Sequence, residues 1–213
     1  MWIVKLGGSL AYSENLQGWL RAFAAADSLV VVPGGGPFAD QVRRIQDHHG
    51  FGHSAAHYMA LLAMEQFGAM LCSLQSGLMP ATAVSEMRAA LKRGDTPVWM
   101  PAPMAMAAPE ISHSWDVTSD SLSAWLCGRL GADALLLVKS LPCLEKTMQL
   151  DVLIERGIVD SRFDRYLQEV DCPAWLMFEQ DFDRFEELLN GDRDAATWIT
   201  RQPGKQSVPL LGN

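Results

Sequence analysis

The sequence predicts an α/β fold, a three-layer αβα sandwich around a mainly parallel sheet. Short apolar, β-branched runs alternate with amphipathic helical patterns along the chain of 213 residues. One of these runs, residues 135–138, is apolar at every position, which is typical of a central parallel strand covered on both faces. Because no repeat and no low-complexity linker divides the chain, we expect a single domain over 1–213, with lobes at about 1–130 and 131–200 and a tail at 201–213.

The first half of the chain alternates strands and helices regularly. We predict strands at residues 2–6, 29–32, 82–84 and 97–100, and helices at 16–26, 38–48, 54–74 and 86–93. The long helix at 54–74 is apolar on several faces, which indicates burial between two layers. Residues 101–109 are rich in Pro, Ala and Met, and we expect them to form a loop that walls a site.

The second half continues this alternation. A polar cluster at 112–120 precedes a helix that Thr118 or Ser119 can cap and that ends at Gly131. The apolar strand at 135–138 follows, and residues 140–160 are irregular. The remaining elements are predicted as a helix at 163–170, a strand at 174–178, a helix at 182–189 and a strand at 197–200.

The composition limits the classes of function. The net charge of -8 and the lack of a basic run argue against nonspecific binding to nucleic acid or to an anionic membrane surface. The four cysteines have no C-x-x-C spacing, and Cys72 and Cys127 lie in apolar helical patterns typical of core residues. Neither a signal peptide nor a bilayer-length apolar run is present, so we expect a reduced, cytoplasmic setting.

Two glycine-rich loops follow predicted strands. Lys5 lies within the first strand, and Gly7, Gly8 and Ser9 come directly after it. A lysine on a buried strand is costly unless an anion meets its ammonium group, and consecutive glycines let a ligand reach bare backbone N–H groups. The second strand leads into another loop of this kind, Gly34-Gly35-Gly36. A phosphate chain would satisfy both loops and the lysine, whereas Lys5 alone could also be a solvated lysine on an edge strand.

The second loop also matches the dinucleotide-binding pattern, as Gly34-x-Gly36-x-x-Ala39. That pattern needs an acidic residue for the ribose, and residues 51–64 contain none, which disfavours a dinucleotide oxidoreductase. The P-loop pattern is absent because no Gly-Lys-Ser/Thr follows the glycines.

Two further charged residues belong near the same edge of the sheet. Lys139 ends the strand at 135–138, and Asp120 lies in the first turn of the helix after Thr118. Ligands of a parallel sheet collect at the carboxyl ends of its strands, so we expect both lysines and both glycine loops to form a polyphosphate site, with Asp120 holding the two ammonium groups. Asp120 alone could instead only complement the helix dipole, and His57 could be a packed or capping residue.

This ordered set of motifs resembles the amino acid kinase family, also called the aspartate/glutamate/uridylate kinase family. The resemblance covers residues 1 to about 200 and rests on Val4-Lys5-Leu6-Gly7-Gly8-Ser9, Val32-Pro33-Gly34-Gly35-Gly36, Thr118-Ser119-Asp120-Ser121 and the strand ending in Lys139. It implies a kinase that uses ATP and Mg²⁺, with an acceptor-side lobe at about 1–130 and a nucleotide-side lobe at about 131–200.

The resemblance also implies roles for individual residues. Lys5, Asp120 and Lys139 would be catalytic, with Lys5 reaching the transferring phosphate and Asp120 orienting the lysines. The nucleotide would be bound by Lys5, Gly7, Gly8, Ser9 and Lys139, and the acceptor would lie beside Gly34, Gly35 and Gly36. No residue is assigned as a metal ligand.

Two departures from the family pattern lie toward the nucleotide side. Ser140-Leu141-Pro142-Cys143 stands where the family often has Val-Asp-Gly, and Ala196-Thr197 stands where Gly-Thr is usual. These departures keep open the alternative of a catalytically silent nucleotide-binding or oligomeric scaffold protein of the same fold.

The small size, the His57-x-Met59-Ala60 helix and the polar run from Ser114 to Asp120 resemble one branch of the family. That branch includes a kinase acting on (aminomethyl)furanmethyl phosphate in methanofuran synthesis, within one-carbon metabolism. It implies a homo-oligomer and a small anionic acceptor, with an organic phosphate preferred to a carboxylate. An anionic oxygen attacks without a general base, and the catalytic cluster offers no obvious one. The acceptor would be contacted by His57, Asp116, Thr118 and Ser119.

Overall fold

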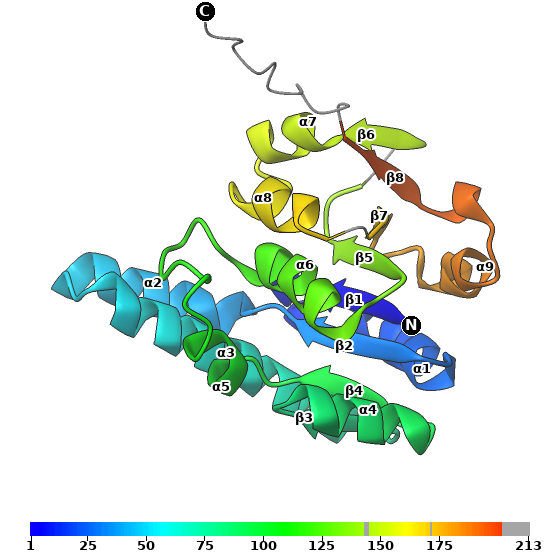
Figure 1. The fold of residues 1–213 in the computed structure, drawn as a ribbon, viewed down its shortest axis with the longest axis horizontal. Helices are drawn as coiled ribbons and strands as arrows, with labels where there is room; N and C mark the ends of the chain where they lie inside the picture. The colour runs from blue at the N-terminus through cyan, green and yellow to red at the C-terminus, as the bar shows by residue number, and fades with distance from the viewer. Residues whose placement is uncertain (143–144, 171, 202–213) are drawn as a thin grey trace, which may run out of the picture.

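The computed structural model describes residues 1–142, 145–170 and 172–201, and Figure 1 shows a layered α/β arrangement. In this part of the chain one sheet has the strand order β3-β4-β2-β1-β5-β7-β8-β6. The strands are β1 (Trp2–Leu6), β2 (Leu29–Pro33), β3 (Leu78–Ala81), β4 (Thr96–Trp99), β5 (Ala134–Lys139), β6 (Thr147–Gln149), β7 (Ala174–Phe178) and β8 (Thr197–Thr200). Neighbouring strands are parallel except β7 and β8, which confirms the predicted mainly parallel sheet.

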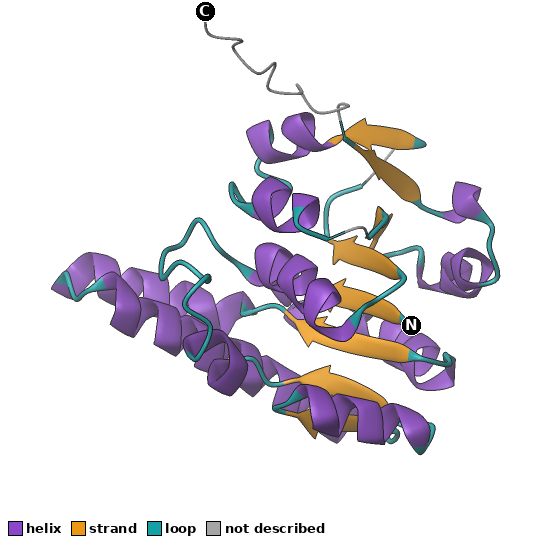
Figure 2. Cartoon of the chain, in the orientation of Figure 1, coloured by secondary structure: helices purple, strands orange, loops and turns teal. Residues whose placement is uncertain are grey.

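Helices cover both faces of the sheet, as Figure 2 shows by colour. They are α1 (Leu16–Ala25), α2 (Gly36–His49), α3 (His53–Leu74), α4 (Val84–Lys92), α5 (Ala102–Met106), α6 (Ser119–Leu130), α7 (Leu150–Glu155), α8 (Phe163–Gln168) and α9 (Phe185–Leu189). Short 3-10 helices are η1 (Gly8–Tyr12), η2 (Phe182–Arg184) and η3 (Arg193–Ala195). The sandwich has the three layers expected from the sequence.

The strands at the centre of the sheet alternate their side chains between two buried clusters. Ile3, Leu135 and Leu137 belong to the cluster that also holds apolar residues of α6, α7 and α8. Val4 and Leu136 belong to the cluster that holds those of α1 and α9. Every one of these five side chains is fully buried, which explains why β1 and β5 are apolar throughout apart from their lysines.

The strand predicted at 82–84 is wrong. β3 ends at Ala81, and Thr82 instead prepares the start of α4, because its backbone N–H and its hydroxyl donate to Glu86 Oε2 at 2.7 and 2.9 Å. β3 contains Pro80, which lowers its strand propensity in the sequence. The position of β3 at the edge of the sheet tolerates this proline.

Three other stretches differ from the prediction, two because they contain regular elements and one because its helix is divided. The loop expected at 101–109 contains α5, whose first amide, that of Ala102, donates to Glu65 Oε1 on α3 at 2.9 Å. The irregular stretch expected at 140–160 contains β6 and α7, and the helix expected at 182–189 is divided into η2 and α9. These elements are three to six residues long, too short for a hydrophobic period to show.

Other expectations concern burial and the ends of the chain. Cys127 lies in the core as predicted, whereas Cys72 is only partly buried. Cys143 and the tail from residue 202 lie outside the described residues, and the division into two lobes stays a prediction. Among the helices of the described residues, none has both the length and the apolar character needed to cross a membrane.

Candidate active site

Two lysines and one aspartate meet at the carboxyl edge of the sheet. Lys5 lies on β1, Lys139 ends the neighbouring strand β5, and Asp120 lies in the first turn of α6. Lys139 Nζ is 2.8 and 2.7 Å from the two carboxylate oxygens of Asp120, and Lys5 Nζ is 3.0 Å from Oδ1. The predicted contact of Asp120 with both ammonium groups is therefore present, although the catalytic roles stay proposals.

The three charged side chains are largely shielded from solvent. The exposed fractions of the side chains are 6% for Lys5, 5% for Asp120 and 12% for Lys139. Burial is the largest influence on Lys5 and lowers its pKa to about 8; Asp120 opposes this effect and Lys139 adds to it. Burial alone would raise the pKa of Asp120, but Lys139 and Lys5 outweigh it and lower that pKa to about 2. At neutral pH the cluster therefore carries an excess positive charge.

The two glycine loops pack backbone against backbone. The amide of Gly34 donates to Leu6 O at 2.9 Å, at the ends of the parallel strands β2 and β1. A Cβ atom on Gly8 would lie 2.1 Å from the backbone nitrogen of Gly36, and one on Gly34 would lie 2.4 Å from that of Gly8. Gly36 also has a φ of +51°, which favours glycine. Side chains are therefore excluded from the junction between the two loops.

A cavity of about 280 Å³ opens beside these loops. The N-terminal turns of three helices contribute to its wall: Gly36 begins α2, His53 begins α3 and Ser119 begins α6. A helix N-terminus carries free amide groups and the positive end of the helix dipole. The cavity therefore favours an anion. Its lining residues are Gly8, Ser9, Gly35, Gly36, Ala39, Asp40, Arg43, His53, Ala56, His57, Ala60, Leu61, Met64, Ser114, Trp115, Val117, Thr118, Ser119 and Leu122.

The predicted site residues do not all reach this cavity. Gly35, Gly36, His57, Thr118 and Ser119 line it, as do Gly8 and Ser9 from the other loop. Gly7 and Gly34 are absent from its lining, and their amides donate to carbonyl groups at the strand ends. Asp116 is exposed and is absent from the cavity lining. The hydroxyl of Thr118 donates to Asp160 at 2.8 Å, so its proton is not available to a ligand.

His57 is buried at the cavity wall, and its ring stacks on His113 with the ring centroids 4.7 Å apart. Its Nε2 atom is buried and has no hydrogen-bond partner among the residues that the structure describes. Burial, with a smaller contribution from His113, lowers the pKa of His57 to about 4. The imidazole is therefore neutral at physiological pH.

Another part of the cavity wall contains an aromatic residue held by α2. Trp115 Nε1 donates to Gln46 Oε1 at 2.6 Å, and the Arg43 guanidinium lies 4.5 Å from the ring centroid of Trp115. Arg43 and Gln46 lie three residues apart and so share a face of α2. This wall, which the sequence did not predict, presents a flat apolar surface next to a positive charge.

A second cavity, of about 170 Å³, lies at the same edge of the sheet. It is lined by Phe178 at the end of β7, the strand next to β5, and Phe178 is paired with Lys139. Thr197 of β8 and Arg184 of η2 form other parts of its wall. The two cavities therefore lie toward opposite ends of the row of strands, with the lysine–aspartate cluster between them.

Sequence comparison assigns this arrangement to a family. Residues 1–142 match the pattern of the amino acid kinase family, which is two thirds of the chain and includes Lys5, Asp120 and Lys139. The chain belongs to the amino acid kinase family. It is therefore a kinase, and the fold and family expected from the sequence are confirmed.

Individual members of the family are similar over nearly the whole chain. The [5-(aminomethyl)furan-3-yl]methyl phosphate kinase of Methanocaldococcus jannaschii is 24% identical over 212 residues, covering 93% of this chain and 97% of that protein. The uridylate kinase structure from Archaeoglobus fulgidus has a TM-score of 0.69 and 15% identity, covering 94% of this chain and all of that one. The UMP kinase structure from Bacillus anthracis has a TM-score of 0.70 and 15% identity, covering 93% and 95%. The two structures support the shared fold.

One contact of this amino acid kinase has no motif in its sequence. Asp160, between α7 and α8, accepts hydrogen bonds from Thr118 and Ser121 at the start of α6. Asp160 is 39 residues from Ser121, so no local pattern could reveal the pair. The start of α6 is thus held from the side predicted to bind the nucleotide.

Proposed function

We propose that this kinase transfers the γ-phosphoryl group of ATP to an anionic oxygen of a small acceptor, an organic phosphate such as (aminomethyl)furanmethyl phosphate. The observation that carries the proposal is the cavity at which the N-termini of α2, α3 and α6 converge, next to the buried cluster of Lys5, Asp120 and Lys139. This cavity favours an anion, and the cluster supplies positive charge beside it. An acceptor phosphate would be held in the cavity and would react beside the cluster.

The residues present fit a triphosphate as phosphoryl donor. The loop that starts at Gly7 meets Lys5 and Lys139 at the strand ends. The close packing of Gly8 on Gly36 keeps side chains out of the junction, so a phosphate in the cavity beside it would meet backbone groups of both loops. The second cavity, beside Phe178, would take the nucleobase. A magnesium ion bound to the triphosphate supplies charge neutralisation, and we assign no side chain of this chain to it.

The transfer would be a single in-line displacement. An oxygen of the acceptor phosphate forms a bond to the γ-phosphorus of ATP, and the bond from that phosphorus to the bridging oxygen of the β-phosphate breaks. The products are ADP and a diphosphate. Lys5 would lie against the oxygens of the transferring group, and Lys139 would neutralise charge on the donor side. Asp120 would hold both ammonium groups in place.

A base-free attack suits this site. Both oxygens of Asp120 already accept from lysines, and His57 has a pKa of about 4, so neither is a suitable base near neutral pH. An acceptor phosphate needs none, because its oxygen is already ionised. A neutral alcohol would have to lose a proton during the reaction.

The remainder of the acceptor would lie against the apolar and aromatic wall. Trp115 offers a flat surface for a ring, and Asp40 is a carboxylate that lines the cavity, where it could pair with an amine. Asp40 is better placed for this contact than Asp116, which is exposed outside the lining. The Methanocaldococcus jannaschii relative, a kinase of an aminomethyl-furan phosphate, supports such an acceptor.

The wider setting follows from the same proposal. An enzyme with this acceptor would serve methanofuran biosynthesis and one-carbon metabolism, as a cytoplasmic homo-oligomer. The complete cluster of Lys5, Asp120 and Lys139 supports catalysis over the alternative of a silent scaffold protein. The sequence change after Lys139 does not disturb these contacts.

The test is a turnover assay with ATP and magnesium chloride, in which ³¹P NMR identifies the product. We expect a diphosphate from (aminomethyl)furanmethyl phosphate and no turnover of the corresponding alcohol. Lys5→Ala should lower kcat at least 100-fold, and Lys92→Ala, at an exposed lysine of α4, should not change it. Turnover of the alcohol at a similar rate, or an unchanged rate in Lys5→Ala, would contradict the proposal.

A further inference from the structure

The geometry points to Asp160 as a positioning residue for phosphoryl transfer, which fixes the first turn of α6 and thereby the carboxylate of Asp120. The inference rests on the proposed function, because it concerns the placement of the Lys5, Asp120 and Lys139 cluster. Asp160 itself contacts neither lysine in any hydrogen bond or ion pair found among the described residues. Its effect on catalysis would therefore pass through α6.

Asp160 uses both carboxylate oxygens on α6. Its Oδ2 atom accepts from the backbone N–H of Thr118 at 2.9 Å, from the hydroxyl of Thr118 at 2.8 Å and from the backbone N–H of Ser121 at 3.0 Å. Its Oδ1 atom accepts from the hydroxyl of Ser121 and from the backbone N–H of Arg162 at 3.2 Å. One carboxylate thus binds the residue before Ser119 and the residue after Asp120.

The helix depends on this carboxylate for its cap. The first amides of a helix have no intrahelical acceptor, and a side chain near the N-cap usually accepts from them. Thr118 occupies the N-cap, but its hydroxyl oxygen is 3.5 Å from the amide of Asp120, the limit of a hydrogen bond. The shorter contacts all go to Asp160, so an acceptor from a distant segment replaces most of the local cap.

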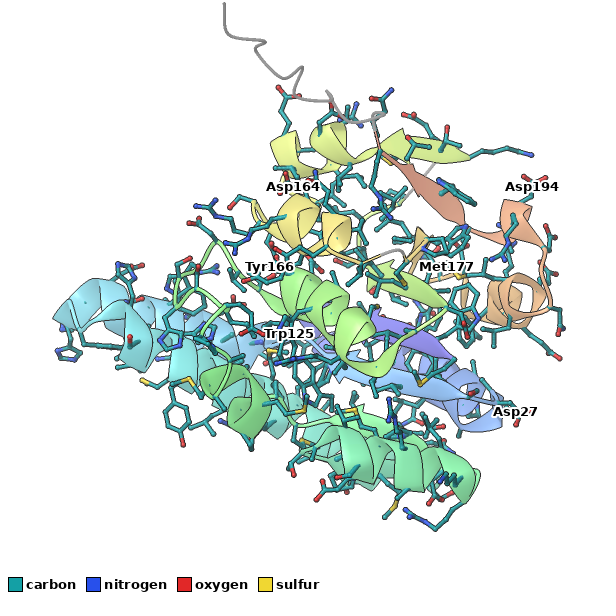
Figure 3. All side chains as sticks on the ribbon, in the orientation of Figure 1. Asp27, Trp125, Asp164, Tyr166, Met177 and Asp194 are labelled. Carbon is teal, nitrogen blue, oxygen red and sulfur yellow. The ribbon has the colours of Figure 1, made fainter. Side chains whose placement is uncertain are left out.

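The segment that carries Asp160 is itself anchored on α6. Figure 3 labels Trp125 on α6 and Tyr166 on α8, and both bond to Glu110 in the loop before α6. The Tyr166 hydroxyl donates to Glu110 O at 3.1 Å, and Trp125 Nε1 donates to Glu110 Oε1 at 2.9 Å. Phe163 and Tyr166 are buried in the core. Asp160 is therefore a fixed support for the start of α6.

This support matters because the geometry of Asp120 leaves little freedom. Its two oxygens lie within 2.7 to 3.0 Å of two ammonium groups on neighbouring strands. A shift of the first turn of α6 would lengthen at least one of these contacts, and Ser119 at the cavity wall would move with it. Lys5 faces Asp120 on α6 and Lys139 on β5, so weaker contact with Asp120 would also lower the pKa of Lys5 below about 8.

The variant Asp160→Asn provides a matched test. Its amide oxygen can still accept from Thr118 and from the backbone of Ser121, and its amide nitrogen can donate to the hydroxyl of Ser121. Asp160→Ala loses all of these bonds. The control is Asp164→Ala (Figure 3). It removes a carboxylate that, within the described part of the chain, accepts only from the amide of Arg165 in α8, at 2.7 Å.

The experiment measures steady-state kinetics with ATP and the acceptor phosphate across pH 6–10, and hydrogen exchange of the amides at 118–121. In Asp160→Ala we expect kcat to fall at least tenfold with KM for ATP changed less than threefold, and the basic limb of the rate profile to move to lower pH. The amides of Thr118 and Ser121 should exchange faster. Asp160→Asn should recover kcat to within about threefold of the parent, and Asp164→Ala should behave as the parent.

The inference is overturned if Asp160→Ala folds and keeps kcat within twofold of the parent, or if its loss is not recovered in Asp160→Asn. If Asp160→Ala does not fold, Ser121→Ala tests the same contact, and it must lower kcat and speed exchange at 118–121 to support the inference. Failure of the proposed function gives a different result. In that case the parent itself shows no phosphoryl transfer, while the exchange data still report whether Asp160 holds α6.

Discussion

Replacement of Lys5 by Met should make the protein more stable and at the same time inactive. Lys5 is buried, and its pKa is about 8 in place of the ordinary 10.5. The charged form of Lys5 is therefore less favourable in the folded protein than in the unfolded chain. At pH 7 this difference corresponds to about 3 kcal/mol against folding. Lys5→Met removes the charge and keeps most of the side-chain volume. We therefore expect the free energy of unfolding at pH 7 to rise by between about 1 and 3 kcal/mol.

The gain should depend on pH with a defined sign. Between about 8 and 10.5 the unfolded parent binds more protons at Lys5 than the folded parent does, so the stability of the parent rises with pH through this window. The advantage of Lys5→Met should then be about 2 kcal/mol smaller at pH 9.5 than at pH 7. Over the same comparison, kcat should fall at least ~100-fold, while the affinity for ATP changes only a few-fold.

Urea denaturation at pH 7 and 9.5, followed by fluorescence, measures the stability, and the turnover assay measures kcat. Lys92→Met replaces an exposed lysine on α4 and should alter the free energy of unfolding by less than about 0.5 kcal/mol. A loss of more than about 1 kcal/mol in Lys5→Met at pH 7 would refute the reasoning. An equal gain at both pH values would refute it as well, since the cost of a charged Lys5 would then not be the cause.

Three other changes test neighbouring features. Asp120→Asn leaves two buried ammonium groups without an anion, so it should cost about 3 kcal/mol of folding free energy in urea and lower kcat about 100-fold; a role limited to the helix dipole would leave kcat unchanged. Gly8→Ala would place a Cβ atom 2.1 Å from the nitrogen of Gly36 and should abolish turnover, whereas Gly52→Ala, with open space around it, should cost less than about 1 kcal/mol and preserve turnover. His57→Asn should leave the pH–rate profile between pH 6 and 8 unchanged in shape, because the pKa of His57 is about 4; loss of a limb in that range would show that His57 acts as a base.

The sequence predicts the centre of this site well because the centre depends on local patterns. Lys5 and Lys139 end or interrupt apolar runs, and the glycines come directly after strands. In a parallel sheet such positions meet at one edge, so a one-dimensional pattern is enough to bring them together. The helix start that carries Asp120 has a local signal as well. Each of these contacts follows once the strands that carry the residues are placed side by side in the sheet.

The walls of the site depend on packing between distant segments and were missed for that reason. Trp115 meets Gln46 across 69 residues, and Asp160 meets Thr118 across 42. Neither pair has a spacing that a sequence pattern could register. Asp116 illustrates the reverse case, since it lies inside a polar motif but is exposed outside the cavity lining. The polar motif predicted that Asp116 contacts the acceptor, but the conformation of the chain at this position places Asp116 outside the cavity.

The strand order sets the distance between the two cavities at the carboxyl edge of the sheet. From the glycine loop after β2 to the second cavity at the end of β7 the row runs through β1 and β5, which is about 14 Å in three interstrand steps. Hydrogen bonds between strands fix this length, and the helices above and below can vary without altering it. If the proposed donor spans this distance, the backbone of the sheet would determine how long a donor can be. A change of side chain could alter which groups bind at either end, but not how far apart they lie.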